Sequence, residues 1–227
     1  YSEKCQITNS KLGTDKNASD ISSSSVSPLG LREYSNTIYT DNNNVIGGTG
    51  AAYAGANKPT TSTISNNYYC VNSNGDELCR DTGSAVNIVL DSQKISVDFT
   101  NNVIDGGTEA ESPTHGLDID GQGTSSNTPA LTIDNCDIGL VNGFHVEASS
   151  SAIHIYEDVS GLQITNTDIG AAKLAGINFL SSTHENIVIS NVTITGDPNY
   201  SFSEYWNVKE AIHAGPILII NRNIKVK

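Results

Sequence analysis

The sequence predicts an all-β protein whose short strands stack as the successive rungs of a β-solenoid. Asn, Ser, Thr, Asp and Gly, which favour turns and strand ends over helices, fill much of the 227-residue chain. Apolar and small polar residues alternate with period two, as in residues 162–165 and 187–190. A motif of the form apolar-x-Asn-x-x-apolar recurs along the chain. Because each apolar face is narrow, its burial requires similar rungs stacked on it.

The Asn of this motif marks a sharp corner between two strands. Seven copies of the motif place corners at Asn9, Asn66, Asn101, Asn135, Asn166, Asn191 and Asn221, and a degenerate eighth copy places one at Asn43. Successive corners lie 23 to 35 residues apart, a spacing typical of solenoid repeats. The corner is regular while the spacing is not, so the loops between strands must vary in length, as a β-solenoid allows. We therefore expect about eight rungs.

The stretch from Leu162 to Gly196, with its phrase Ile-Val-Ile-Ser-Asn-Val-Thr-Ile-Thr-Gly, resembles the right-handed parallel β-helix, or pectin-lyase-like, superfamily. The resemblance implies a right-handed parallel β-helix in which each corner Asn bonds to the Asn of the next rung, forming an Asn ladder with long lateral loops. It covers residues 85–225 well and the Ser- and Asn-rich residues 1–84 poorly. We therefore expect loop-rich rungs in 1–84 and regular rungs in 85–227.

The charge of the chain limits its partners. A net charge of −13 at pH 7 argues against nucleic acid, because phosphate binding requires a basic face. Cations, uncharged sugars or basic partners suit an acidic surface better, although acidity also serves solubility alone. No apolar run reaches the roughly eighteen residues of a membrane-spanning helix. The chain starts at Tyr1 without a signal-like segment, and we expect it to be processed or excised from something longer.

The four cysteines are too unevenly spaced for a zinc site. Cys70 and Cys79 bracket a polar loop that a disulfide would close, which favours an oxidising compartment and thus a secreted or surface location. Cys136 is either a buried free thiol within a rung or the partner of Cys5.

A second repeated segment follows the corners and begins at Gly116, Gly143, Gly176 and, more loosely, Ala211. If its copies align rung on rung, they stack outward side chains about 4.8 Å apart: Asp118, His145, Asn178 and His213, with Asp120 and Glu147 two residues further on. Such a stripe could bind a sugar chain or a metal, supply acid and base groups, or simply be a solvated face. His145 and Glu147 are the catalytic candidates, and Asp118, Asp120 and Asn178 the substrate-binding ones. Residues 203–214 also fit a short amphipathic helix.

Asp137 and Asp168 each lie two residues after a corner Asn, so we expect them side by side on adjacent rungs. Stacked carboxylates repel, and the pKa of one should rise unless a cation or a hydrogen-bond donor intervenes. The two are therefore a candidate catalytic acid/base pair or a Ca²⁺ site, with two solvated carboxylates as the alternative.

The segment Asn166-Thr167-Asp168 is similar to the first signature of the polygalacturonase family of β-helix glycoside hydrolases, which implies a catalytic role for Asp168. The family pattern continues with Asp-Asp, Gly-His-Gly and Arg-x-Lys. This chain has no Asp-Asp after Asp168 and no Gly-His-Gly, and only residues 222–225 approach the last element. A pectate-lyase-like reaction would need a basic residue beside a calcium-binding acidic cluster, and only Lys173 is near in sequence.

Aromatic residues cluster in the loop after Gly196: Tyr200, Phe202, Tyr205 and Trp206. Aromatic rings over a polar groove stack on the faces of sugars, which makes Tyr205 and Trp206 substrate-binding candidates. The alternative is a lid over the apolar side of the terminal rungs.

Together these features favour a secreted, cell-surface or virion-surface β-helix that acts as a scaffold for recognition or adhesion, with a glycan or a host surface as its partner. The incomplete catalytic signature favours the scaffold over the alternative, a polysaccharide hydrolase or lyase. Both ends of the chain hold nearly complete corner strands, and a bare solenoid end exposes unpaired backbone. We therefore expect part of a longer helix, a covered end or a homo-oligomer.

Overall fold

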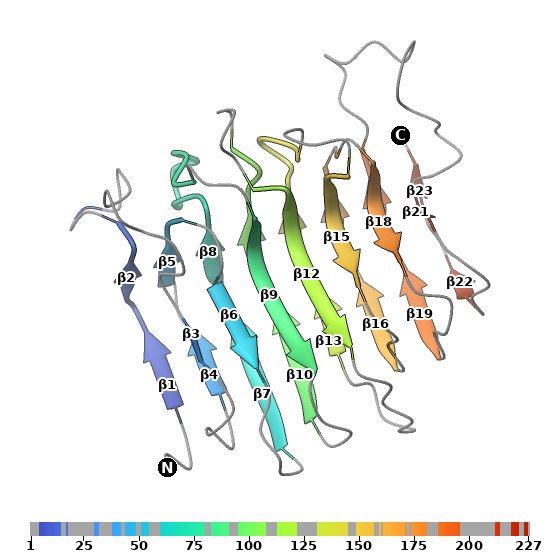
Figure 1. The fold of residues 1–227 in the computed structure, drawn as a ribbon, viewed down its shortest axis with the longest axis horizontal. Coiled ribbons are helices and arrows are strands. Elements are labelled where there is room, and N and C mark those ends of the chain that lie inside the picture. The colour runs from blue at the N-terminus through green and yellow to red at the C-terminus, as the bar shows by residue number, and fades with distance from the viewer. Residues whose placement is uncertain are drawn as a thin grey trace.

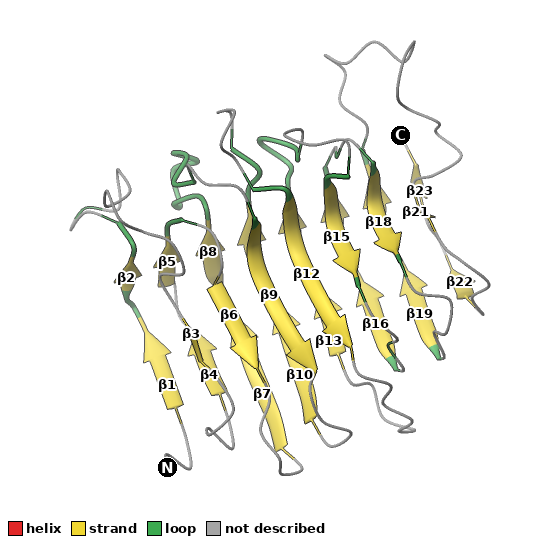
Figure 2. Cartoon of the chain, in the orientation of Figure 1, coloured by secondary structure: helices red, strands yellow, loops and turns green. Residues whose placement is uncertain are grey.

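The computed structural model describes residues 5–14, 17, 30–31, 38–41, 44–48, 51–54, 60–79, 83–90, 95–107, 113–121, 131–144, 149–156, 159, 161–170, 172, 174–180, 186–195, 212–213, 219–222 and 225–226. Every regular element in these residues is a β-strand, and Figure 2 shows strands joined by loops. The predicted all-β class is confirmed.

The strands of the described residues form three sheets, and neighbouring strands in each sheet are parallel. The first sheet holds β1 (Cys5–Thr8), β4 (Ile38–Asp41), β7 (Thr60–Ser65), β10 (Ile95–Thr100), β13 (Leu131–Asp134), β16 (Leu162–Thr165), β19 (Ile187–Ser190) and β22 (Ile219–Arg222). The second sheet holds β2 (Lys11–Leu12), β5 (Asn44–Ile46), β8 (Asn67–Tyr69), β11 (Val103–Ile104), β14 (Asp137–Ile138), β17 (Asp168–Ile169), β20 (Thr193–Ile194) and β23 (Lys225–Val226). The third sheet holds β3 (Gly30–Leu31), β6 (Ala51–Ala54), β9 (Ser84–Leu90), β12 (His115–Gly121), β15 (Ser151–Ile155), β18 (Ala175–Phe179) and β21 (Ile212–His213).

The chain visits the three sheets in turn. β10, β11 and β12 belong to the first, second and third sheets, and β13 then returns to pair with β10. Figure 1 shows the strands side by side along the molecule, from β1 at one end to β22 at the other. This successive stacking is consistent with a β-solenoid. The sheets continue across residue 84, because β6 pairs with β9 and β7 with β10; the division into a loop-rich 1–84 and a regular 85–227 stays a prediction.

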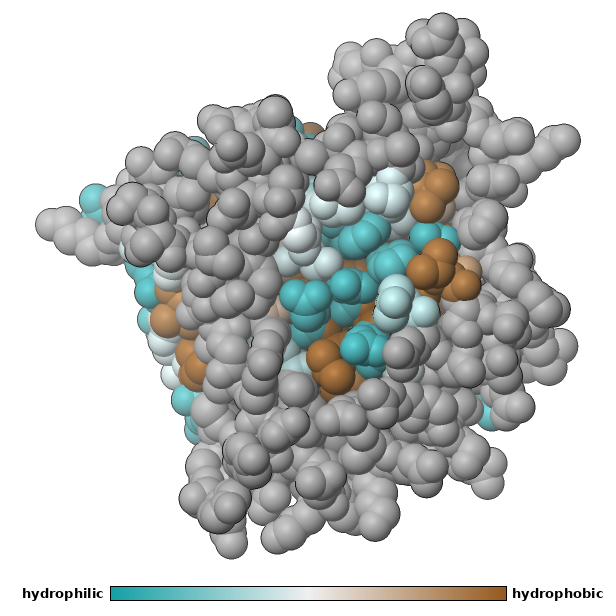
Figure 3. Space-filling model, viewed as in Figure 1, coloured by the Kyte–Doolittle hydropathy of each residue, from teal (hydrophilic) through white to brown (hydrophobic). Residues whose placement is uncertain are grey.

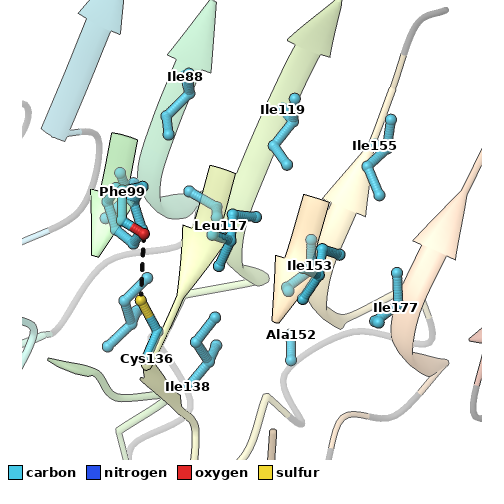
Figure 4. Packing of buried hydrophobic residues seen from close by; sticks show 14 of the residues in the cluster. Ile88, Phe99, Leu117, Ile119, Cys136, Ile138, Ala152, Ile153, Ile155 and Ile177 are labelled. Carbon is cyan, nitrogen blue, oxygen red and sulfur yellow. Dashed lines mark hydrogen bonds between the residues drawn. The ribbon is translucent and has the colours of Figure 1, made fainter. Parts of the chain in front are cut away.

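The core consists of columns of apolar side chains that repeat from rung to rung. In the third sheet Ile88, Ile119 and Ile155 are register partners and fully buried, and Figure 4 shows them in a row on three successive strands. Similar buried columns run through the first sheet at Phe99, Ile133, Ile164 and Ile189, and through the second at Ile104, Ile138, Ile169 and Ile194. Burial of each such side chain contributes about 1.5–3 kcal/mol to the stability of the fold. The stacked rungs therefore bury the apolar surface that a single rung would leave exposed.

The corner residues have a left-handed backbone, with φ between 48° and 54°, at Asn9, Asn66, Asn101, Asn135, Asn166 and Asn191. Asn adopts this conformation more readily than other side chains do, which explains its recurrence. Asn135 Nδ2 donates to Asn101 Oδ1 at 2.6 Å, and Asn191 Nδ2 donates to Asn166 Oδ1 at 2.6 Å. Between these pairs, Asn166 Nδ2 donates to Asp134 Oδ1 at 2.8 Å. An Asn ladder through all the corners stays a prediction.

The predicted corner at Asn221 is wrong. Asn221 lies within β22, where it pairs with Ile189, and Arg222 pairs with Ser190. The sequence has Asn at both 221 and 223, and the motif was assigned to the first of the two. Residue 223, like the predicted corner residue Asn43, lies outside the described residues.

A second column of Asn side chains lies inside the solenoid, one residue after the corners. Asn44 Nδ2 donates to Asn67 Oδ1 at 2.8 Å, and Asn67 Nδ2 donates to Asn102 Oδ1 at 2.9 Å. All three residues are fully buried. Asn102 Nδ2 in turn donates to the carbonyl oxygen of Ile64 at 2.8 Å. These bonds satisfy amides that would otherwise be costly to bury.

Of the four cysteines, the described side chains form one disulfide and one free thiol. Cys70 and Cys79 are bonded, with their Cα atoms 4.7 Å apart, as predicted. Cys136 is a buried free thiol, so of its two alternatives the unpaired one is correct. Its Sγ lies 3.4 Å from the carbonyl oxygen of Asp134, and burial raises the pKa of the thiol to about 12. Figure 4 shows Cys136 beside Phe99 within the core.

Candidate functional site

One column of polar residues crosses the third sheet. The parallel register of β9, β12, β15, β18 and β21 places five residues at one position on successive strands: Asn87, Asp118, His154, Asn178 and His213. Ile119 and Ile155, one residue further along their strands, are fully buried in the core. Because side chains alternate along a strand, Asp118 and His154 are turned to the outer face of the sheet.

The position next to Asp118 belongs to His154, and the predicted alignment of His145 with Asp118 is wrong. Residues 143–147 and 151–155 both follow the corner at Asn135 in the sequence, and both alternate in the way that a strand of this sheet requires. The strand β15 forms from the second of these segments. The sequence placed Asp118, Asn178 and His213 at one position of adjacent strands, in agreement with the register.

Asp118 and His154 form a hydrogen-bonded pair. His154 Nδ1 lies 2.9 Å from Asp118 Oδ1, and Ser84 Oγ donates to the other carboxylate oxygen, Asp118 Oδ2, at 3.2 Å. The side chains are 28% exposed for Asp118 and 11% for His154, so solvent reaches both. Because an ionised carboxylate only accepts hydrogen bonds, this contact places a proton on His154 Nδ1.

A second imidazole lies against His154. The rings of His115 and His154 are stacked with centroids 4.2 Å apart and an interplanar angle of 10°. The backbone N–H of Ser151 donates to His115 Nδ1 at 3.1 Å, which requires a lone pair there. Burial and the neighbouring His154 lower the pKa of His115 to about 4, although the Asp118 carboxylate opposes this shift. His115 is therefore neutral at pH 7, with its proton on Nε2.

Two large side chains are exposed beside this column. Tyr156 and Leu180 directly follow β15 and β18 and are 54% and 57% exposed. Their backbone N–H groups donate to the carbonyl oxygens of Ile119 and Ile155, so the parallel register continues past the strand ends. The Tyr156 ring lies 6.2 Å from the His154 ring. In Figure 3 hydrophilic side chains gather in the middle of the face, with hydrophobic side chains next to them.

Asn178 carries an unsatisfied acceptor at the far side of His154. The residue is 2% exposed, and its Oδ1 atom is buried without a hydrogen-bond partner. A buried polar atom without a partner costs about 1–3 kcal/mol, so such an atom is rare in a structural position. Its register partner is His154. A donor group brought by a ligand would satisfy it.

Asp137 and Asp168 lie side by side on the second sheet, as the sequence predicted. Both side chains are exposed to solvent. Partial burial and then the negative charge of Asp168 raise the pKa of Asp137 above its ordinary value. The two carboxylates belong to a different sheet from Asp118 and His154, so the structure divides the predicted acidic residues between two places.

No group of three or more His, Cys, Asp or Glu side chains among the described residues is arranged to hold a metal ion. The Ca²⁺ site at Asp137 and Asp168 therefore stays a prediction. Two carboxylates supply oxygen ligands of the kind that Ca²⁺ takes, but a protein site ordinarily provides about six to eight such oxygens, including water.

The sequence did not single out one buried carboxylate, Asp105. Its two oxygens accept hydrogen bonds from the backbone N–H and from Nδ2 of Asn142, each at 2.8 Å. Burial raises the pKa of Asp105, against the opposing effect of its hydrogen bonds to Asn142, Gly106 and Gly107. Gly106 N also donates to the Asn142 carbonyl oxygen at 2.9 Å. Asp105 thus holds the segment before His145 against the preceding rung.

Four of the predicted site residues lie outside the described residues: His145, Glu147, Tyr205 and Trp206. The helix considered for residues 203–214 is contradicted at Ile212–His213, which forms β21. Sequence reasoning missed His154, His115 and Tyr156. The alternation of Ser-Ala-Ile-His-Ile in residues 151–155 would have located His154.

The described residues contain no helix of the length and apolarity that crossing a membrane demands. No protein-family model, no curated protein and no solved structure matches the chain.

Proposed function

We propose that the protein is a right-handed parallel β-helix of the pectin-lyase-like superfamily, with about eight rungs and an Asn ladder, that recognises a glycan through the outer face of its third sheet. The observation that carries this proposal is the row Asn87, Asp118, His154 and Asn178 at one register position of four successive strands. The proposal includes long lateral loops, with Tyr205 and Trp206 as further sugar-binding side chains. The alternative partner is a protein of a host surface.

The row suits a sugar chain because of its chemistry and its repeat. Neighbouring strands lie about 4.8 Å apart, so the row offers amide, carboxylate and imidazole groups at regular steps. Sugar hydroxyls both donate and accept hydrogen bonds, and Asn178 Oδ1 is an acceptor without a donor. Tyr156 adds an exposed ring beside His154, and such rings stack on the apolar faces of sugars.

A location outside the cytosol follows from the same proposal. The Cys70–Cys79 disulfide is of a kind that persists in oxidising compartments. We therefore place the protein in the secreted, cell-surface or virion-surface class, as an adhesin or recognition scaffold.

Binding to an array of neutral and acidic oligosaccharides tests the proposal. We expect the wild-type chain to bind a subset of these glycans, and Tyr156→Ala to weaken that binding about tenfold, equivalent to about 1.4 kcal/mol. Gln163→Ala is the matched control, because Gln163 lies on the first sheet. No bound glycan, or equal binding by wild type and Tyr156→Ala, would contradict the proposal.

Polysaccharide cleavage at Asp137 and Asp168 is the second candidate, and their register pairing favours it. Glycoside hydrolases use two carboxyl groups, one of which is kept protonated by a raised pKa. The raised pKa of Asp137 fits the acid, and Asp168 would be the nucleophile or base. Incubation with acidic polysaccharides, scored by reducing ends and by absorbance of new double bonds, tests it. Activity that is lost in Asp168→Asn would favour the enzyme over the scaffold; activity that persists in Asp168→Asn, or no activity, would reject this site.

A further inference from the structure

We propose that His154 is a general base and His115 an oxyanion donor, and that together they hydrolyse an acyl ester carried by a neutral sugar. This inference rests on the glycan recognition proposed above and adds a reaction to it. It uses the histidine pair on the third sheet and is independent of Asp137 and Asp168.

The hydrogen bond of His154 to Asp118 leaves its Nε2 atom unprotonated, as a general base requires. Its Nδ1 proton is held by Asp118 Oδ1 at 2.9 Å, which leaves the lone pair on Nε2. A carboxylate in this position fixes the orientation of the imidazole and stabilises the cation that forms when Nε2 takes a proton. Asp118 is itself fixed by Ser84 Oγ at 3.2 Å. Asp118 and Ser84 are positioning residues.

His115 has the complementary tautomer. The Ser151 N–H occupies its Nδ1, so its Nε2 carries a proton, and its pKa of about 4 keeps it neutral at pH 7. The parallel stacking of the two rings, 4.2 Å apart, places a proton acceptor and a proton donor on adjacent planes. No described residue hydrogen-bonds Nε2 of either ring. A neutral imidazole N–H can stabilise an oxygen that gains negative charge during a reaction.

The charge around the pair selects the substrate. Residues 95–172 contain twelve Asp and Glu residues and no Lys or Arg. This segment would repel polyuronates, phosphate esters and sulfate esters. It also contains no Lys or Arg side chain that could stabilise the enolate of an elimination reaction. An ester on a neutral sugar needs only a base, a water molecule and a donor to its carbonyl oxygen, and this site provides the base and the donor.

The proposed steps balance. His154 Nε2 takes a proton from water, and the hydroxide oxygen bonds to the ester carbonyl carbon while His115 Nε2–H donates to the carbonyl oxygen. The tetrahedral intermediate then breaks its bond to the sugar oxygen, which takes the proton from His154 Nε2. The products are the free sugar hydroxyl and a carboxylic acid. The acid ionises in solvent, and the surrounding carboxylates repel it.

Release of acetate from O-acetylated xylo-oligosaccharides tests the proposal, with O-acetylated polygalacturonate as the acidic comparison. We expect turnover of the neutral substrate to exceed that of the acidic one. His154→Gln should lower kcat about 10²- to 10⁴-fold, the range for loss of a general base. His115→Phe keeps a stacked ring without the donor and should lower kcat about 10²- to 10³-fold. Asp118→Asn should lower kcat by a larger factor than it raises KM, since Asp118 orients the base in addition to lining the glycan-binding row.

Gln163→Ala is the control for all of these variants, and circular dichroism checks that each variant is folded. If His154→Gln does not fold, Asp118→Asn, which changes no volume, takes its place. The proposal is overturned if the wild type releases no acetate above the buffer rate, or if His154→Gln or its replacement retains the wild-type kcat. Glycan binding measured in parallel separates the two proposals, because binding without turnover rejects the esterase and leaves the recognition site intact.

Discussion

His115 and His154 lie ring to ring, yet their hydrogen bonds give them opposite tautomers. The difference comes from their partners, since a backbone N–H faces one Nδ1 atom and a carboxylate faces the other. Partner identity therefore decides which of two adjacent imidazoles donates a proton and which accepts one. The residue type alone carries no such information.

Asp105 shows the cost of removing a buried acceptor. Asp105→Ala should lower the free energy of unfolding by about 1–3 kcal/mol, because the N–H and Nδ2 groups of Asn142 lose their acceptors. Urea unfolding followed by circular dichroism measures the change. Thr132→Ala, a surface substitution on the first sheet, should change it by no more than about 0.5 kcal/mol. An equally small effect for Asp105→Ala would mean that Asn142 finds other partners.

The raised pKa of Asp137 predicts the direction in which the stability of the fold changes with pH. Its pKa is raised in the folded chain, so its contribution to stability is complete below the ordinary pKa of 3.8 and is lost as the pH rises through the higher pKa of the folded chain. Asp137→Asn removes this loss and relieves repulsion from Asp168. The variant should therefore be more stable than wild type at pH 7, by at most about 1 kcal/mol because the side chain is exposed.

Unfolding curves at pH 3 and pH 7 check this prediction. The advantage of Asp137→Asn should disappear at the lower pH, where the Asp137 carboxyl group is largely protonated. A variant that is less stable than wild type at pH 7 would show that a bound cation or a hydrogen bond already relieves the repulsion.

At the scale of the element, the Asn corner combines a backbone requirement with a side-chain bond. Asn135 has φ of 51° and donates to Asn101. Asn135→Ala should lower the free energy of unfolding by about 1–2 kcal/mol, because Ala resists the left-handed conformation. Asn135→Gly loses the same side-chain hydrogen bond, but Gly adopts the left-handed conformation without strain. It should therefore lower the free energy of unfolding by less than Asn135→Ala does. Urea unfolding of both variants measures the difference, and equal costs would assign the whole effect to the side-chain bond.

The strands and their corners followed from the sequence, whereas their register did not. Period-two alternation and the Asn motif located β16, β17, β19 and β20, because both signals are local to the chain. The register of the strands depends on the number of residues in each loop, and a local sequence pattern does not determine loop length. The assignments of His145 and Asn221 failed for this reason, since the sequence repeats each pattern a few residues further on, at 151–155 and at 223.

The candidate site was predicted in part. Asp118 and Asn178 were assigned to the outer face of one sheet, and the neighbours Asp137 and Asp168 were paired correctly. The stacked histidines were missed, because His115 stands three residues before Asp118 while its ring reaches His154 on the next strand. Contacts that run diagonally between strands have no sequence spacing of their own.

At the scale of the whole molecule, the continuous core should protect its free thiol. Cys136 is 1% exposed, and burial raises the pKa of its thiol to about 12, so the reactive thiolate is scarce. We expect iodoacetamide to leave Cys136 unmodified in native buffer at pH 8 and to modify it in concentrated urea. Mass spectrometry of proteolytic peptides measures the label on Cys136 separately from any label on Cys5. Rapid labelling of Cys136 in the native chain would mean that the rungs around β13 and β14 open locally.

The buried Asn column also has a consequence for how the stack assembles. A solenoid of similar strands risks pairing any strand with one that is not its true neighbour, because their Ile columns are nearly interchangeable. At the first interior position after the corner, three consecutive rungs carry Asn44, Asn67 and Asn102, and the next three carry Cys136, Thr167 and Val192. Amide pairs can form only among the first three. The Asn column therefore favours pairing among these three rungs over pairing of their strands with later rungs during folding.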